Sequence, residues 1–276
     1  MRKLGCKRCK LVYLNPQPNQ AVLDYFYRIE NRYFSPSYQR SPLFVRKLSS
    51  IGFQKKVNIL SNFINLKNKL RLLDIGCSSG DFLYQLQKRF PFEVYGIDKD
   101  DKAIEFINEN YKNIKAYQGT IFDVNLENNY FDIIIMSGYL EHEKKIAEAL
   151  GKVNELLKPK GIIIIEAANI EDKLAQLDID HWPYWVPPFH IIHFSPSTIQ
   201  MVLSNANFKV LDIKFDITAP YILKYSQLLL YLLYRYNIRY DSHFLDYLIY
   251  QISRPIKPIE KKMGFFGKMI IIGQKN

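Results

Sequence analysis

The hydrophobic and polar positions of residues 70–168 alternate between two patterns. Short continuous apolar runs predict buried β-strands, and stretches whose apolar residues recur every three or four positions predict helices. The predicted strands cover residues 70–75, 92–97, 114–117, 131–136 and 162–166, and the predicted helices cover residues 81–89, 100–110 and 144–157. Continuous apolar strands that alternate with amphipathic helices are typical of a parallel sheet with helices on both faces.

The same alternation continues on both sides of this region. Upstream, residues 20–27 and 43–64 predict helices. Downstream of an aromatic and proline-rich loop at 178–194, the pattern predicts helices at 195–205 and 221–256 and strands at 208–215 and 268–273. We therefore expect an α/β chain with a doubly wound sheet of seven strands, the last of them antiparallel. The predicted divisions are a basic N-terminal segment at 1–66, a core at 67–218, a helical insertion at 219–262 and the last core strand at 263–276.

The positive charge of the chain is concentrated near its N-terminus. The net charge is +11, and residues 1–70 hold 14 lysines and arginines against two acids, a net charge of +12. Residues 71–170 have a net charge of −4. This composition excludes an acidic disordered protein and leaves nucleic acid, an anionic membrane face or phosphate-bearing small molecules as partners. We interpret residues 1–70 as a docking surface for an anionic acceptor, membrane or partner.

Cysteine use and hydropathy indicate a cytoplasmic protein. Three cysteines are too few for a secreted disulfide framework. The basic N-terminus lacks the apolar run of a signal peptide, and no apolar window reaches the ~18 residues of a spanning helix. The leucine- and tyrosine-rich stretch at 221–256 is interpreted as a helical cover or homodimer contact, or alternatively as an interfacial helix on the inner face of the membrane.

A glycine loop joins the first predicted strand of the core to its helix, in the sequence Asp74-Ile75-Gly76-Cys77-Ser78-Ser79-Gly80. Glycines at such a turn let a ligand approach the backbone, and the following helix start supplies N–H groups. Asp98 ends the next strand, where a carboxylate can accept hydrogen bonds from ribose hydroxyls. Phe122 and Asp123 follow the third strand.

These motifs resemble those of the class I S-adenosylmethionine-dependent methyltransferases. The family's first motif is D-x-G-x-G-x-G, and Ser78 stands where its middle glycine is usual. The resemblance covers roughly residues 4–216 and the last strand. Besides the first motif, it includes residues 131–136, Leu140-Glu141-His142, residues 156–161 and His193-Phe194-Ser195-Pro196. It implies a Rossmann-like fold and S-adenosylmethionine as cofactor.

The resemblance also implies roles for individual residues. Gly76 and Gly80 would line the methionine portion of the cofactor, and Asp98 would bind the ribose hydroxyls. The remaining cofactor positions are Phe122 and Asp123 at the adenine, Ser137 and Gly138 facing the sulfonium, and Asp74, Cys77, Ser78 and Lys99.

Catalysis by such an enzyme depends mainly on positioning, and a general base is needed only for a hydroxyl or carbon acceptor. The candidates in the predicted cleft loops are Tyr139, Glu141, His142, His190 and His193. We favour His193 or His142 as the base. The alternative interpretation of each histidine is a structural role. Ubiquinone-pathway O-methyltransferases carry a metal-binding E-x-x-E-H here, and Gly138 replaces its first acid, so no metal is expected.

Cys6 and Cys9 resemble half of the N-terminal zinc ribbon of a methyltransferase subgroup that includes enzymes acting on nucleotide-linked sugars. A tetrahedral zinc site needs four ligands, so we expect no zinc. The subgroup implies O- or C-methylation of a small acceptor, a sugar or lipid-linked glycan intermediate. An RNA methyltransferase and a non-catalytic binding subunit are the alternatives; no RNA-binding module is recognised, so nucleic acid is the less favoured partner.

Overall fold

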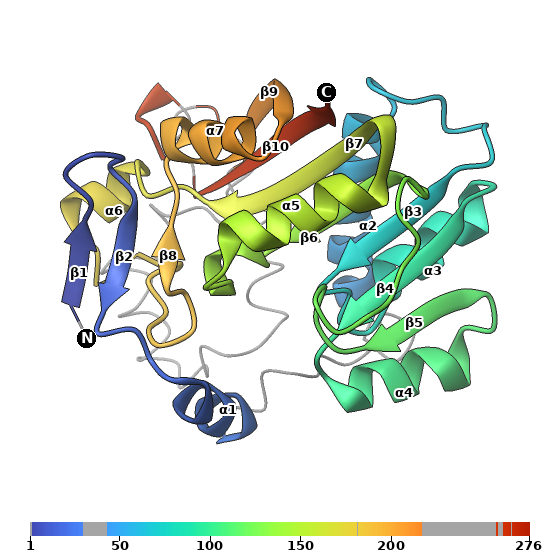
Figure 1. Cartoon of the computed structure of the whole chain (residues 1–276), viewed down its shortest axis with the longest axis horizontal. Coiled ribbons are helices and arrows are strands. Elements are labelled where there is room, and N and C mark those ends of the chain that lie inside the picture. The colour runs from blue at the N-terminus through green and yellow to red at the C-terminus, as the bar shows by residue number, and fades with distance from the viewer. Residues whose placement is uncertain (1, 30–42, 181, 217–257, 259–261, 266) are drawn as a thin grey trace.

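A seven-stranded sheet forms the centre of the protein, in the order β5-β4-β3-β6-β7-β10-β9 (Figure 1). The computed structural model describes residues 2–29, 43–180, 182–216, 258, 262–265 and 267–276. The strands of this sheet are β3 (Arg71–Ile75), β4 (Glu93–Asp98), β5 (Ile114–Gln118), β6 (Phe131–Ser137), β7 (Leu157–Ala168), β9 (Phe208–Asp216) and β10 (Lys268–Lys275).

The strand directions confirm the predicted doubly wound sheet. Strands β3 to β7 pair in parallel, and β10 inserts antiparallel between β7 and β9. The strand order reverses between β3 and β6, the two strands that start the two halves of the sheet. Ligands of open α/β sheets bind at such a switch point, outside the carboxyl ends of the strands.

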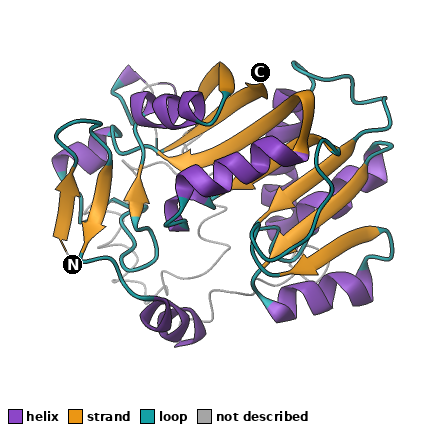
Figure 2. Cartoon of the chain, in the orientation of Figure 1, coloured by secondary structure: helices purple, strands orange, loops and turns teal. Residues whose placement is uncertain are grey.

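Helices cover both faces of the sheet (Figure 2). One face packs against α2 (Leu43–Leu60), α3 (Asp81–Arg89) and α4 (Asp101–Asn110), which bury residues such as Val57, Leu83 and Ile107. The other face packs against α5 (Ile146–Leu156) and α7 (Pro196–Asn205). Ser195 is the N-cap of α7 and forms a capping box with Thr198, as its Ser-Pro sequence predicts.

Two element boundaries differ from the prediction by more than two residues. Strand β7 begins at Leu157, five residues before the predicted start at 162, and residues 158–161 lie between the Phe131–Leu157 and Ile133–Ile162 pairs of the ladder. Leu157 pairs with Phe131 across an irregularity in the β6–β7 ladder. Helix α2 ends at Leu60, where the pattern predicts 64.

A second, three-stranded sheet ties the N-terminus to the aromatic loop. It contains β1 (Arg2–Gly5), β2 (Val12–Asn15) and β8 (Ile192–His193), all antiparallel. Strand β8 lies within the segment predicted as a loop, since two residues carry no periodicity. Helix α1 (Gln20–Ile29) follows the hairpin, and α6 (Lys173–Leu177) and the 3₁₀ turn η2 (Leu140–His142) complete the described elements.

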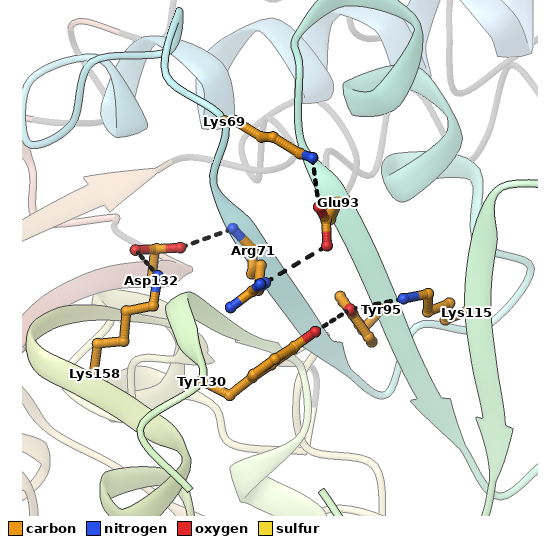
Figure 3. A network of polar contacts seen from close by, with 8 residues as sticks. All are labelled: Lys69, Arg71, Glu93, Tyr95, Lys115, Tyr130, Asp132 and Lys158. Carbon is orange, nitrogen blue, oxygen red and sulfur yellow. Dashed lines mark hydrogen bonds and ion pairs between the residues drawn. The ribbon is translucent and has the colours of Figure 1, made fainter. Parts of the chain in front are cut away.

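The amino ends of the central strands share a polar network (Figure 3). Asp132 accepts a hydrogen bond from the backbone N–H of Arg71 and pairs with Lys158, at 2.8 and 2.7 Å. The Arg71 guanidinium lies 4.0 Å from the ring centre of Tyr130, whose hydroxyl is 2.8 Å from that of Tyr95. These contacts join β3, β4, β6 and β7 at the edge opposite the predicted ligand site.

The predicted helical stretch at 221–256 lies outside the described residues. Within the described part of the chain, we find no helix with the length and apolar character that crossing a membrane requires.

Candidate functional site

The glycine loop after β3 adopts the left-handed backbone that its sequence predicts. Gly76, Ser78 and Gly80 have φ angles of 81°, 47° and 70°. A Cβ atom on Gly80 would lie 2.9 Å from Ile107, so glycine is required there for packing as well as for conformation. Ser78 adopts the positive φ at the position where the family's middle glycine is usual.

Asp98 ends β4 beside this loop, and two backbone donors fix its carboxylate. Oδ2 accepts a hydrogen bond from Ser78 N at 2.7 Å, and Oδ1 accepts one from Asp100 N at 3.0 Å. Burial raises the pKa of Asp98, and these N–H groups oppose that rise. A carboxylate accepts about four hydrogen bonds, so Asp98 retains capacity for a ligand.

A cavity of about 660 Å³ opens at the carboxyl ends of β3, β4 and β6. Its volume is in the range of small-molecule sites. Nine of the predicted site residues line it: Gly76, Ser78, Asp98, Lys99, Phe122, Gly138, Tyr139, His142 and His190. Phe122 is 43% exposed and lines the cavity, where an aromatic side chain can contact a planar ligand.

Two histidines of the cavity lining contact each other. The rings of His142 and His190 are nearly perpendicular, with centres 4.7 Å apart. Nδ1 of His190 lies 2.9 Å from the carbonyl oxygen of Tyr184. The cavity lining also includes Tyr139, whose hydroxyl donates to Glu143 Oε2 at 3.2 Å. Burial and the neighbouring Glu143 raise the pKa of Tyr139, so its phenol stays protonated.

The other predicted site residues do not line the cavity. His193 is 1% exposed among Trp182, Trp185 and His190, and burial lowers the pKa of its ring to about 3. Six further predicted residues are also outside the lining: Asp74, Cys77, Gly80, Asp123, Ser137 and Glu141. Asp123 Oδ2 accepts from the backbone N–H and hydroxyl of Thr120, which lines the cavity.

Several lining residues are absent from the sequence prediction: Leu23, Ile97, Gly119, Thr120, Glu143, Lys144, Lys145 and Phe189. Leu23 comes from α1, and Phe189 comes from the aromatic loop and meets Phe26 of α1 edge to face at 6.5 Å. The aromatic loop and the helix at 20–27 are both visible in the sequence, but no local pattern places them against the glycine loop.

A charged cluster behind Ser137 is also absent from the sequence prediction. Lys56 of α2 and Lys268 of β10 pair with Glu166 of β7 at 3.2 and 2.8 Å. The Lys56 ammonium also donates to the Ser137 hydroxyl at 2.8 Å. The two lysines and their neighbouring hydrogen bonds lower the pKa of Glu166 to about 2 against the effect of its burial.

Cys6 and Cys9 form a tight turn at the tip of the β1–β2 hairpin. The backbone N–H of Cys9 donates to Cys6 Sγ at 3.5 Å, and this contact lowers the pKa of Cys6. No group of three or more histidine, cysteine, aspartate or glutamate side chains arranged to hold a metal ion is found among the residues the structure describes.

The strand order, the glycine loop and the cavity at the switch point are those of a class I methyltransferase. A family model described as "Methyltransferase domain" matches residues 46–213, more than half of the chain. The chain therefore belongs to the methyltransferase domain family, and it is an S-adenosylmethionine-dependent methyltransferase.

Known proteins resemble the chain at low identity. A ubiquinone biosynthesis O-methyltransferase of Rickettsia bellii is 25% identical over 206 residues, which cover 71% of this chain and 84% of that protein. A tRNA U34 carboxymethyltransferase of Aliarcobacter butzleri is 28% identical over 120 residues, 42% of this chain and 39% of that protein. The fold is shared with an S-adenosylmethionine-dependent methyltransferase from Archaeoglobus fulgidus, with a TM-score of 0.58 at 20% identity over 91% of this chain and all of that one.

The residues around the cavity fit S-adenosylmethionine. Asp98 offers remaining acceptor capacity for hydroxyl groups, and Phe122 offers an exposed ring face. A Cβ atom on Gly76 would lie 3.4 Å from the Tyr139 ring. Glycine therefore leaves open the space between the loop backbone and that ring. We expect Gly76 and Gly138 at the methionine end and Phe122 at the adenine end.

Proposed function

We propose that the chain methylates a hydroxyl oxygen of a small acceptor, with His190 as the general base and His142 as its neighbour. The hydrogen bond of His190 to a backbone carbonyl carries this proposal. A carbonyl oxygen only accepts, so Nδ1 of His190 must hold the proton in that contact, at 2.9 Å from Tyr184 O. The neutral ring then has its lone pair on Nε2, the state that accepts a proton.

The cofactor supplies a methyl group on a cationic sulfur, which is already activated. The chain's own task is to hold the acceptor and to remove its hydroxyl proton. His190 and His142 line the same cavity as the glycine loop, and its volume of about 660 Å³ leaves room for an acceptor beside the cofactor. Burial lowers the pKa of His193, and its ring does not line the cavity. We therefore assign the base to His190 and its neighbour His142, which do line it.

The residues that line the cavity together with the histidines support one class of acceptor. Leu23 and Phe189 supply apolar surface to the cavity, and Lys99, Lys144 and Lys145 line it together with the acids Asp98 and Glu143. This combination suits a hydroxylated compound with an apolar face and an anionic group, such as a sugar nucleotide or lipid-linked sugar. The name of the Rickettsia bellii relative supports transfer to oxygen.

A labelled-methyl assay tests the proposal. Wild type, His190→Ala and His142→Ala are incubated with labelled S-adenosylmethionine and a panel of sugar nucleotides, lipid-linked sugars and phenols. Removing a general base costs typically about 10²–10⁴-fold in rate, so we expect such a loss in His190→Ala and a smaller loss in His142→Ala. Cofactor affinity, measured by calorimetry, should stay within about twofold of wild type in both variants.

The pH dependence separates a base from a structural histidine. A general base acts only in its unprotonated form, so the wild-type rate should fall on the acid side of its pH profile, and this acid limb should disappear in His190→Ala. Full activity of His190→Ala would contradict the assignment. Methyl transfer to RNA, with binding that weakens steeply as salt rises, would instead favour the RNA alternative, which the basic residues 1–70 permit.

A further inference from the structure

Tyr139 lies at the end of the cavity where the methionine portion of the cofactor is expected. It directly follows Gly138 after strand β6, and both residues line the cavity. A Cβ atom on Gly76 would lie 3.4 Å from the Tyr139 ring, so this ring borders the space beside the glycine loop. Tyr139 therefore supplies an aromatic ring to the methionine end of the cavity.

The position of this ring is fixed by Glu143, four residues further along the chain. The Tyr139 hydroxyl donates to Glu143 Oε2 at 3.2 Å, and the backbone N–H of Lys145 donates to Oε1 at 2.8 Å. Each carboxylate oxygen accepts one of these bonds, and a carboxylate accepts about four in all. Glu143 also lines the cavity, so it retains acceptor capacity and negative charge for a ligand.

The carboxylates among the described residues of the cavity lining belong to Asp98 and Glu143. Two backbone N–H groups hold Asp98, and we assign its remaining acceptor capacity to the hydroxyl groups of the cofactor. The buried acids Asp74 and Glu141 are outside the lining. Glu143 is therefore the carboxylate of the lining that is left to meet a positively charged group of the ligand.

The two lysines that follow Glu143 have ammonium groups with other partners. The Lys144 ammonium donates to the carbonyl oxygen of Pro18 at 2.6 Å. The Lys145 ammonium pairs with Glu148 Oε2 on the exposed side of α5 at 3.1 Å. Neither contact involves the Glu143 carboxylate, so these two lysines do not occupy its acceptor positions.

We propose that Tyr139 and Glu143 form a subsite for the positively charged sulfur of the methyl donor, and that this subsite distinguishes the donor from its neutral product. An aromatic ring attracts a cation at its face, and a nearby carboxylate adds a Coulomb attraction. S-adenosylhomocysteine, which remains after methyl transfer, has a neutral sulfur and loses both attractions. The subsite acts on the donor alone, whatever the acceptor.

Calorimetric titration with S-adenosylmethionine and with S-adenosylhomocysteine tests the proposal without an acceptor. The two ligands share their adenosine, ammonium and carboxylate groups and differ in the methyl group and the charge on sulfur. The ratio of their affinities therefore separates the subsite from the rest of the cavity. Tyr139→Leu removes the ring, and we expect it to weaken binding of the donor about tenfold while binding of the product stays within about twofold. Tyr139→Phe keeps the ring and should keep most of the wild-type ratio.

Glu143→Gln separates the charge of the carboxylate from its hydrogen bond to Tyr139. The amide oxygen still accepts from the Tyr139 hydroxyl, so affinity for the donor should fall about threefold or more through the lost charge, without a change for the product. Glu148→Gln is the matched control, because this exposed acid pairs with Lys145 at 3.1 Å, and it should leave the ratio unchanged. An unchanged ratio in Tyr139→Leu, whether both affinities fall or neither does, or an unchanged ratio in Glu143→Gln, would overturn the proposal.

Discussion

Asp98 holds its carboxylate at the edge of the cavity through two backbone donors, so removing it affects the ligand more than the fold. A hydrogen bond to a charged group contributes about 1.5–3 kcal/mol. We expect Asp98→Ala to weaken the binding of S-adenosylmethionine about tenfold or more, measured by calorimetry. Asp101→Ala, three residues along on the exposed start of α4, should bind the cofactor as wild type does. Unchanged affinity in Asp98→Ala would contradict its assignment.

At the scale of single residues, sequence motifs locate what directly follows a strand. Gly76, Ser78, Asp98 and Gly138 each stand within a few residues of the carboxyl end of a central strand, so their order along the chain places them at one cavity. Leu23, Lys56 and Phe189 come from segments whose position depends on tertiary packing. No local periodicity encodes which side chain of an amphipathic helix reaches a sheet edge, and these residues were therefore not predicted.

At the scale of elements, Asp132 joins three strands at the amino edge of the sheet (Figure 3). Its two oxygens accept from Arg71 N of β3 and pair with Lys158 of β7. Its loss leaves a partly buried N–H and an ammonium without their acceptor, at a cost of about 1–3 kcal/mol. We expect Asp132→Ala to lower the free energy of unfolding by this amount in urea titrations.

The control for this variant is an exposed pair on the neighbouring helix. Lys152 and Glu155 form an i,i+3 pair on α5 at 3.2 Å, and such pairs contribute little. Lys152→Ala should change the free energy of unfolding by less than about 0.5 kcal/mol. An equal effect of both variants would show that the network at the amino edge adds no specific stability. Cofactor affinity should be the same in both, because the network lies at the opposite edge from the cavity.

Hydrophobic patterning predicts the elements of the sheet because its strands are buried on both faces and its helices on one. It does not predict β8, which is two residues long, or the pairing of β8 with the N-terminal hairpin. It also places the start of β7 too late, since Lys158, Pro159 and Lys160 interrupt the apolar run that marks the strand. The strand starts earlier because Leu157 pairs with Phe131 of β6 before these polar positions, and that pairing is a tertiary contact.

At the scale of the whole molecule, the positive charge and the buried carboxyl groups lie in different parts of the chain. The excess of lysine and arginine belongs to residues 1–70, whereas Asp74, Asp98, Glu141 and Glu166 lie at the carboxyl edge of the sheet. Lys56 belongs to the basic segment, and its ammonium pairs with Glu166 at the carboxyl edge of the sheet. One lysine of the basic segment therefore lies beside the carboxyl edge of the sheet, where these acids are found.

Buried carboxyl groups also make the stability of the molecule depend on pH. Glu141 is 4% exposed, and burial raises its pKa to about 7. Its native pKa lies above the unfolded value of about 4.3, so its contribution to stability is fully present below that value and is lost as the pH rises through 7. We therefore expect the contribution of Glu141 to the free energy of unfolding to fall as the pH rises from 5 through about 7.

Glu141→Gln replaces the titrating carboxyl by an amide that keeps the shape of the protonated form. At about 1.4 kcal/mol per pKa unit, the wild type should lose up to about 3 kcal/mol more than this variant between pH 5 and pH 9, measured by urea unfolding. Glu148→Gln, at an exposed position on α5, should follow the wild-type curve. Parallel curves for wild type and Glu141→Gln would show that Glu141 ionises at the same pH in the folded and unfolded chain.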